Sequence, residues 1–125
     1  MITELKKFDN GTFEVVIGKE LVLEDLMVVR DFIDEMIAES KGGCRKIFGC
    51  LNLKNVSLPS TKFFQKDLGL IDKYKSYIGG MAIVGDEDWE KAWFKLVSSL
   101  ANVKIKFFAS KAKARAKKWL DSIAK

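Results

Sequence analysis

Residues 81–93 read MAIVGDEDWEKAW, an apolar run that stops at a glycine and resumes with helical spacing. Four small or β-branched apolar residues without alternation indicate a strand that is covered on both faces. We expect Gly85 to supply the backbone freedom for the turn and Asp86 to cap the following helix, whose acidic first turn suits the helix dipole. The stretch therefore predicts a central strand at 78–85 and a helix at 87–101.

The segments downstream continue the alternation of strand and helix. In the predicted helix 87–101, the residues expected to point inward are Trp89, Ala92, Trp93, Leu96 and Leu100, with Phe94 and Val97 to one side. Residues 103–107 alternate apolar side chains with Lys104 and Lys106, which predicts a last strand with one basic face. An amphipathic helix is predicted over 110–124, with an apolar face that includes Ala116, Trp119 and Leu120.

Two strands joined by a tight turn open the chain. They are predicted at 2–8 and 12–18, and Asp9-Asn10-Gly11 lies between them, where Asn and Gly tolerate the positive φ of a hairpin turn. Residues 45–53 carry a further run of strand-forming residues. This order predicts an antiparallel first pair, followed by strands that are parallel because helices connect them.

The helix predicted over 23–40, which Gly42 and Gly43 end, has a broad apolar arc. Its main stripe comprises Leu26, Val29, Ile33, Met36 and Ile37. Val28 and Phe32 lie beside this stripe, so the arc is wider than contact with one sheet requires. Two interpretations stay open: a second helix packs beside this one, or the arc is one wall of an apolar pocket.

The segment 54–77 is the most aromatic part of the chain. Ser60 or Thr61 can cap a helix that begins there. We expect Gly69 to break this helix and a second short turn, with Leu70, Ile71 and Tyr74, to follow. An interrupted helix near the carboxyl end of a strand is open to two interpretations, a plain helix–loop–helix or a movable flap.

The 125 residues are predicted to form one domain, residues 1–125, with a mixed α/β sheet and about four helices.

The chain has no histidine, which excludes Ser-His-Asp triads and most zinc or iron sites. Cys44 and Cys50 lack the C-x-x-C spacing of redox and zinc motifs, and we expect Cys50 to be a buried thiol. No pair of carboxylates falls in a recognisably apolar setting, Cys44 has no base to activate it, and no glycine-rich phosphate loop is present, so we expect no enzymatic activity, no cofactor and no metal.

Basic residues gather at the carboxyl end of the chain. Residues 103–125 hold eight Lys or Arg and one acidic residue, in a chain of net charge +5. The side chains with which this segment would contact an anionic membrane are Lys104, Lys106, Lys111, Lys113, Arg115, Lys117 and Lys118. A Lys-rich face also serves solubility alone, and both interpretations stay open. We expect no nucleic-acid partner, because no recognition motif is present and the aromatic residues of this segment suit a core.

Three segments share a pattern with a known family. They are residues 83–91, IVGDEDWEK, the apolar strand at 103–108, and the closing Ala-rich helix with Trp119 and Leu120. Together with residues 1–5 they resemble the SpoIIAA-like family over nearly the whole chain, and VGDxxWEK is the most specific part. The resemblance implies a STAS-type fold, related in shape to CRAL-TRIO lipid carriers, without an established enzymatic reaction. It also implies apolar ligand binding and membrane association, with open and closed arrangements of the helices.

The resemblance implies an alternative function as well. The anti-sigma-factor antagonists after which the family is named carry an Asp-Ser pair after the third strand, and phosphorylation of the serine switches partner binding. Here Ser60 stands where the acid would be, Thr61 stands where the acceptor would be, and Lys62 replaces the small residue that follows. The alternative is therefore a regulatory protein-interaction module that is switched by phosphorylation at Ser60 or Thr61.

Our leading hypothesis is a non-enzymatic domain that holds a lipid-like ligand between helix 23–40 and the aromatic segment 62–77. The side chains that would line the pocket are Phe32, Met36, Phe63, Phe64 and Tyr74. Met and aromatic residues suit an adaptable apolar site, although they suit an ordinary core equally well. Because no signal core or membrane-spanning run is found, we expect a cytoplasmic protein with peripheral contact at the inner membrane face. We also expect a monomer or a weak homodimer.

Overall fold

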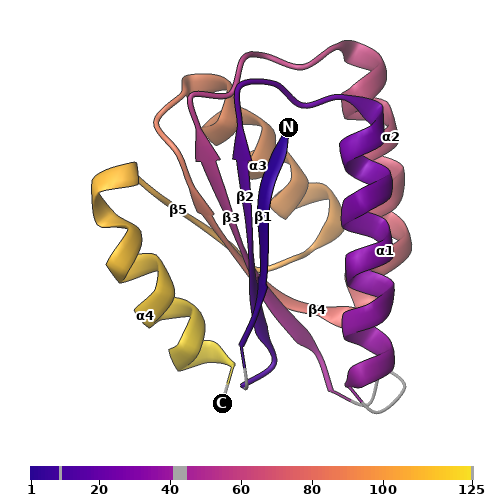
Figure 1. The fold of residues 1–125 in the computed structure, drawn as a ribbon, viewed down its shortest axis with the longest axis vertical. Helices are drawn as coiled ribbons and strands as arrows, with labels where there is room; N and C mark the ends of the chain where they lie inside the picture. The colour runs from indigo at the N-terminus through magenta and orange to yellow at the C-terminus, as the bar shows by residue number, and fades with distance from the viewer. Residues whose placement is uncertain (9, 41–44, 125) are drawn as a thin grey trace.

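The computed structural model describes residues 1–8, 10–40 and 45–124, which form five strands and four α-helices (Figure 1). The strands are β1 (Ile2–Lys7), β2 (Thr12–Gly18), β3 (Ile47–Lys54), β4 (Ile78–Val84) and β5 (Ile105–Phe108). The helices are α1 (Leu23–Glu39), α2 (Thr61–Tyr74), α3 (Asp88–Ala101) and α4 (Lys113–Ile123), with the 3₁₀ turns η1 (Lys75–Tyr77) and η2 (Ser110–Ala112).

The sheet is mixed, and its strands follow chain order. β1 pairs antiparallel with β2, and each later strand pairs parallel with the one before it. A helix joins the two members of every parallel pair, as crossover connections require. The predicted mixed sheet with an antiparallel first hairpin is confirmed. In the turn before β2, Gly11 has the positive φ of 80° that favours glycine. Three other residues predicted to form turns, Asp9, Gly42 and Gly43, lie outside the described residues.

The strands present alternate side chains to two cores, one on each face of the sheet. The larger core joins the sheet to α1, α2 and α3, and its strand residues include Phe13, Val15, Leu53 and Ile83. The smaller core joins the sheet to α4 and is built from Cys50, Ala82, Val84, Ala116 and Leu120. In Figure 1, α1 and α2 accordingly lie on the right of the sheet and α4 lies on its left.

Small residues let α4 approach the sheet closely. Ala82 of β4 and Ala116 of α4 are fully buried, and Gly80 lies directly against Ile123. The ring of Trp119 extends this core to β5, because its centroid lies 6.1 Å from that of Phe108. The predicted apolar face of the last helix is confirmed.

α2 is continuous, so the predicted break at Gly69 is wrong. Its N-cap is Ser60, whose hydroxyl accepts a hydrogen bond from the N–H of Phe63 at 3.1 Å. Gly69 lies on the exposed side of the helix, and Phe63 and Tyr74 are buried near its two ends. Their burial outweighs the cost of one interior glycine, which is about 1 kcal/mol. The separate short turn predicted at Leu70, Ile71 and Tyr74 is also wrong, because these residues belong to α2, and η1 begins only after the helix ends.

The start of α3 differs from the prediction in its capping. Glu87 is the N-cap in place of Asp86, and its N–H donates to Oε1 of Glu90 at 3.0 Å. Asp86 instead accepts hydrogen bonds from the N–H and the hydroxyl of Ser110, at 3.0 and 2.5 Å. Gly85 does not have a positive φ; it is needed because a side chain there would collide with the Glu90 carboxylate.

The inward face of α3 also differs from the prediction. Its buried residues are Glu90, Val97 and Ala101, whereas three residues expected to point inward, Ala92, Leu96 and Leu100, are exposed. The cause is the direction of Trp89 and Trp93, whose indole N–H groups bond to α2 and to the loop before it. These bonds set the rotation of the helix about its axis, which periodicity alone does not determine.

Candidate ligand-binding cavity

A cavity of about 110 Å³ lies between the sheet and helices α1, α2 and α3. Its aliphatic walls include Ile17, Val29, Ile33, Leu70, Ile71, Met81 and Ile105. Its aromatic walls are Phe13, Phe63, Tyr74, Trp89, Trp93 and Phe94. Two carboxylates, Asp25 and Asp67, reach the same space. The cavity is therefore an apolar space with acidic groups in its wall.

The five residues predicted to bind a ligand occupy three kinds of position. Phe63 and Tyr74 line the cavity. Phe32 and Met36 are buried in the core between α1 and the sheet, where the Phe32 ring packs edge-on against Phe13 at 5.4 Å between centroids. Phe64 packs against two tryptophans of α3 instead. Ligand contact by these residues stays a prediction.

An aromatic cluster of Phe64, Trp89 and Trp93 holds α2, α3 and the loop before α2 together. The centroid of the Phe64 ring lies 6.0 Å from that of Trp89 and 4.5 Å from that of Trp93. Trp89 Nε1 donates to the carbonyl oxygen of Val56 at 3.1 Å, which holds the loop against α3. This cluster encloses the cavity from the α3 side.

Asp67 is the functional candidate that sequence reasoning missed. Its Oδ2 accepts a hydrogen bond from Trp93 Nε1 at 2.9 Å, across the contact between α2 and α3. Burial raises the pKa of Asp67 to about 6, because desolvation outweighs the stabilising hydrogen bond from Trp93. The signal was available in the sequence: Asp67 falls at helical spacing between Phe63 and Leu70, so one carboxylate interrupts the apolar stripe of α2.

Asp25, the other carboxylate of the cavity wall, has a structural role. Its Oδ1 accepts from the N–H of Ile2 at 3.3 Å, and its Oδ2 accepts from the N–H of Val22 at 2.9 Å. The amino terminus of Met1 lies 3.5 Å from Oδ2. Asp25 therefore ties β1 to the start of α1, and both of its oxygens are engaged.

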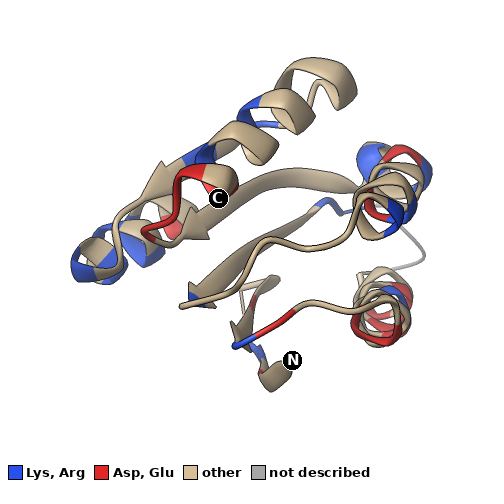
Figure 2. Cartoon of the chain, turned by 90° about the horizontal axis from the view of Figure 1, so that it is seen from above, with Lys and Arg blue, Asp and Glu red and all other residues tan. Residues whose placement is uncertain are grey.

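The basic residues predicted to contact membranes fall into two groups. Lys104, Lys106, Lys111, Arg115 and Lys118 are exposed, and none of them has an ion pair among the residues that the structure describes. Lys113 and Lys117 pair with acidic groups of the protein. Figure 2 shows the basic residues along α4 and the acidic residues of α1 on the other side of the sheet.

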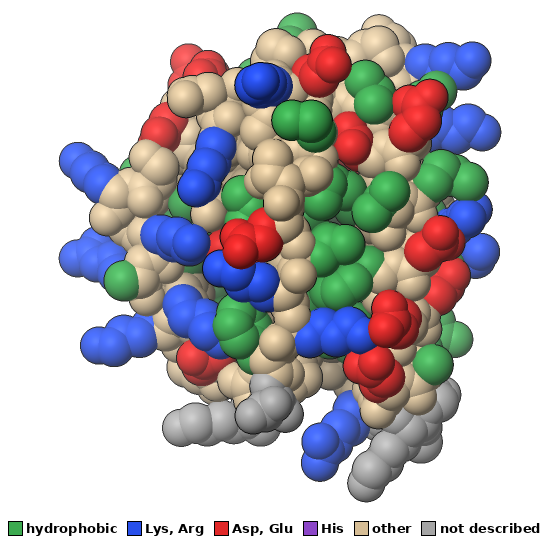
Figure 3. All heavy atoms as spheres, in the orientation of Figure 1, with side chains coloured by type: hydrophobic (Ala, Val, Ile, Leu, Met, Phe, Trp, Pro, Cys, Tyr) green, Lys and Arg blue, Asp and Glu red, His purple; other side chains and the backbone are tan. Residues whose placement is uncertain are grey.

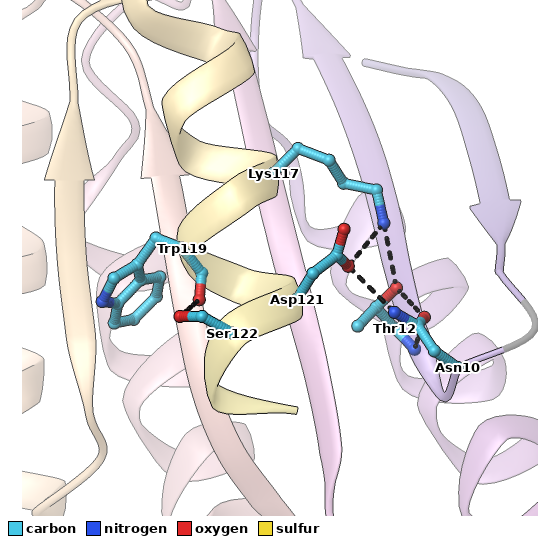
Figure 4. Close-up of polar contacts among 6 residues, drawn as sticks. All are labelled: Asn10, Thr12, Lys117, Trp119, Asp121 and Ser122. Carbon is cyan, nitrogen blue, oxygen red and sulfur yellow. Dashed lines mark hydrogen bonds and ion pairs between the residues drawn. The ribbon is translucent and has the colours of Figure 1, made fainter. Parts of the chain in front are cut away.

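Lys117 attaches α4 to the first hairpin (Figure 4). Its Nζ lies 2.9 Å from Oδ1 of Asp121, 3.3 Å from Oγ1 of Thr12 and 4.0 Å from the centroid of the Phe8 ring. Nδ2 of Asn10 donates to the same Asp121 oxygen at 2.9 Å. The bonds from Lys117 and Asn10 hold the pKa of Asp121 below its ordinary value. Lys117 therefore serves the fold and is less available to a membrane.

Glu14 is buried beside α4, on the side of the sheet opposite the cavity. Nδ2 of Asn52 donates to Oε2 of Glu14 at 3.3 Å, and the amines of Lys113 and Lys6 lie 3.2 and 3.8 Å from its oxygens. On the left of Figure 3, where α4 lies in the same orientation in Figure 1, basic side chains gather with acidic ones among them. Cys50, beside Glu14, is buried, which confirms the predicted buried thiol. Burial raises the pKa of this thiol to about 12. Cys44 lies outside the described residues.

The hydroxyls considered as phosphorylation sites lie at the N-terminus of α2. Ser60 and Thr61 are both exposed, and the Ser60 hydroxyl is engaged as the N-cap. Thr61 is the first residue of the helix and follows β3 in the chain, as the resemblance implied. Modification of either residue stays a prediction.

The family of the chain follows from comparison with known proteins. A family model described as SpoIIAA-like matches residues 12–121. The chain belongs to the SpoIIAA-like family. Membership of this family supports a non-catalytic, STAS-type domain. In the part of the chain that the structure describes, no helix has both the length and the apolar character needed to cross a bilayer.

A solved structure shares the SpoIIAA-like fold. It is an uncharacterized protein of the DUF3478 family from Shewanella loihica PV-4, solved at 2.25 Å resolution, with 20% sequence identity and a TM-score of 0.70. The similarity covers 96% of this chain and 92% of the other. At this identity the likeness establishes the fold and carries no function. Comparison with curated proteins gave no match.

Proposed function

We propose that this SpoIIAA-like domain is non-enzymatic and holds a small apolar molecule in the cavity between the sheet and helices α1, α2 and α3. The observation that supports the proposal is an almost wholly apolar cavity of about 110 Å³. Protein interiors leave few voids larger than a water molecule, and an engineered apolar void of about 150 Å³ in another protein binds benzene. A space of this size suits a single ring or a short branched chain.

A longer, lipid-like ligand would require α1 and α2 to move away from the sheet. The packing of the helices supports such a movement. α2 has its closest neighbours in α1, α3 and η1, whereas α4 lies directly against β4. Side chains, rather than close backbone contacts, therefore fill the space beneath α2. An outward shift of α1 and α2 enlarges the cavity and leaves the small core under α4 in place.

Native mass spectrometry of freshly purified protein tests ligand carriage. We expect an adduct that is absent from a denatured sample of the same preparation. Ile71→Phe places a ring in the cavity wall and should reduce the fraction of protein carrying the adduct by about 10-fold or more, because a well-packed site does not accept both groups. The measurement is the ratio of adduct to free protein in the wild type and in the variant.

The control is Leu96→Phe. Leu96 is 48% exposed on α3 and does not line the cavity, so the same ring added there should leave the adduct unchanged. An adduct that Ile71→Phe retains in full would show that the bound molecule occupies another site. A wild-type preparation with no adduct would count against carriage of a tightly held ligand.

We also propose that the exposed basic residues of β5, η2 and α4, with Lys104 directly before β5, bring the domain to anionic membrane surfaces. The support is the grouping of Lys104, Lys106, Lys111, Arg115 and Lys118 on neighbouring elements near the carboxyl end. Each cation near an anionic surface contributes about 1 kcal/mol. Trp119 is partly buried against Phe108, so the contact would be mainly electrostatic and shallow.

Co-sedimentation with vesicles tests the membrane contact. Vesicles of phosphatidylcholine with about 30% phosphatidylserine should bind the protein, and vesicles of phosphatidylcholine alone should not. Replacing Lys111 and Lys118 with Ala should weaken binding by roughly 30-fold, since two cations are lost. Replacing Lys62 and Lys66 of α2 with Ala removes the same charge elsewhere and should have little effect. Equal losses in both double variants would indicate attraction to net charge without a defined surface.

The alternative function is a regulatory module that is switched by phosphorylation. It is supported by the exposure of Thr61 at the first position of α2. A phosphate there would lie near the free N–H groups of the helix start, which favour negative charge. Phosphorylation of Ser60 would instead disturb its cap bond to Phe63, so Thr61 is the better acceptor of the two.

A further inference from the structure

The polar groups in the cavity wall have partners with one exception. The Tyr74 hydroxyl donates to Oδ1 of Asp34 at 2.5 Å, and the indole N–H of Trp89 donates to Val56. Both oxygens of Asp25 accept backbone hydrogen bonds. Asp67 accepts one hydrogen bond, at Oδ2 from Trp93. Among the described residues, no hydrogen bond or ion pair reaches Oδ1 of Asp67.

The charged groups that line the cavity are all acidic. Within the described part of the chain, its wall contains Asp25 and Asp67 and no Lys or Arg, and the sequence has no histidine. An anionic ligand group would therefore meet a carboxylate and no compensating cation. Burying such a group without a partner is strongly unfavourable, which argues against fatty acids and phosphorylated headgroups inside the cavity.

We propose that the cavity selects apolar molecules that carry one hydrogen-bond donor, a hydroxyl or amino group, and that Asp67 is the residue that recognises this donor. The inference rests on the proposed function of small-ligand binding and adds the chemical class of the ligand. A donor on the ligand completes the hydrogen bonding of a carboxylate that Trp93 satisfies at one oxygen only. Hydrogen bonds to charged groups are the stronger ones, so the donor contributes affinity as well as orientation.

The surroundings of Asp67 agree with this role. It lies on the same stripe of α2 as Phe63, Leu70 and Tyr74, which all line the cavity. Poor solvation in this wall raises its pKa to about 6, and the carboxylate is nonetheless retained without an ion pair among the described residues. An aliphatic side chain here would leave the indole N–H of Trp93 without its acceptor, so Asp67 also serves the contact between α2 and α3. That contact uses Oδ2 alone, which leaves Oδ1 for a donor on the ligand.

Three single-ring probes of similar shape test the inference, namely toluene, p-cresol and p-toluate. Binding to the purified chain is measured by NMR titration at pH 7.5. We expect p-cresol to bind about 5-fold or more tightly than toluene, because it adds one hydrogen bond to a carboxylate. We expect p-toluate to bind at least about 10-fold more weakly than toluene, because its charge has no cation to pair with.

Variants of Asp67 identify the residue responsible. Asp67→Leu should retain toluene binding and lose the preference for p-cresol, because it removes the acceptor. Asp67→Asn keeps an oxygen for Trp93 and removes the charge, so p-toluate should bind this variant more tightly than it binds the wild type. It provides a second test if the Leu variant does not fold. Asp72→Asn, at an exposed position on the same helix, should leave all three affinities unchanged.

The outcomes separate this inference from the function on which it rests. Equal affinities of toluene and p-cresol for the wild type would overturn the inference and leave the proposed function intact. A preference for p-cresol that survives in both Asp67 variants would overturn it too, because the donor would then be recognised elsewhere. If none of the three probes binds, the proposed function fails and the inference fails with it.

Discussion

Replacing Asp67 with Asn is expected to raise the free energy of unfolding at pH 7.5 by about 1–3 kcal/mol. Burial raises the pKa of Asp67 from 3.8 to about 6, so the folded chain holds this proton more tightly than the unfolded chain does. Its contribution to stability is most favourable below the unfolded pKa and is lost as the pH rises through about 6. At pH 7.5 the carboxylate is ionised in both states, and the full penalty applies. Asn has no such penalty and keeps an acceptor for Trp93.

Urea denaturation at pH 5 and pH 7.5 measures this effect. The gain from Asp67→Asn should be smaller at pH 5, where the folded protein largely holds the proton and avoids part of the penalty. Asp72→Asn is the matched control, because Asp72 is exposed on the same helix and, among the described residues, pairs only with Lys75 at 2.8 Å. A gain of equal size at both pH values would contradict desolvation of the carboxylate as the cause.

Replacing Gly85 with Ala is expected to lower the free energy of unfolding by about 1–3 kcal/mol. A methyl group at this position would collide with the side-chain carboxylate of Glu90. That carboxylate is held in place by the N–H of Glu87, and Oε2 of the fully buried Glu90 has no hydrogen-bond partner among the described residues. Moving the carboxylate aside would break its hydrogen bond from Glu87, and keeping it in place would require β4 or the first turn of α3 to shift. Thermal or urea denaturation measures the loss.

Two further variants show whether the collision is the cause. Gly69→Ala makes the same chemical change in α2, where a methyl group meets no neighbouring atom, and should stabilise the chain by up to about 1 kcal/mol. In the double variant Gly85→Ala with Glu90→Ala, the added methyl group has space. The free energy of unfolding of the double variant should therefore fall by less than the sum of the losses in the two single variants. Additive losses would show that Gly85 matters for another reason.

The order of the elements could be predicted because each strand and helix carries its own periodicity. The unbroken apolar run before Gly85 and the alternation at β5 are local signals, and the sheet forms at both places. The rotation of α3 could not be predicted in this way. It depends on Val56 and Asp67, which lie far from Trp89 and Trp93 in the chain and accept hydrogen bonds from them.

The candidate site could be predicted only in part for a related reason. An apolar stripe identifies side chains that are buried, but it does not separate those that fill a core from those that border a space. Phe63 lines the cavity, whereas Phe32, of the same residue type, fills the core. Asp67 was missed because one carboxylate in a helix is ordinary at a solvated position. Only the structure shows that its carboxylate is partly buried against Trp93 of α3.

The sheet that separates the two cores also separates the two proposed activities. Among the described residues, the cavity wall and the core under α4 share no side chain, because alternate residues of each strand point to opposite faces. A ligand that displaces α1 and α2 therefore leaves Ala116 and Leu120 undisturbed. The coupling free energy between ligand occupancy and membrane contact is expected to be near zero unless the sheet itself changes its twist. A partner that senses the bound molecule would have to do so from the side of α1 and α2.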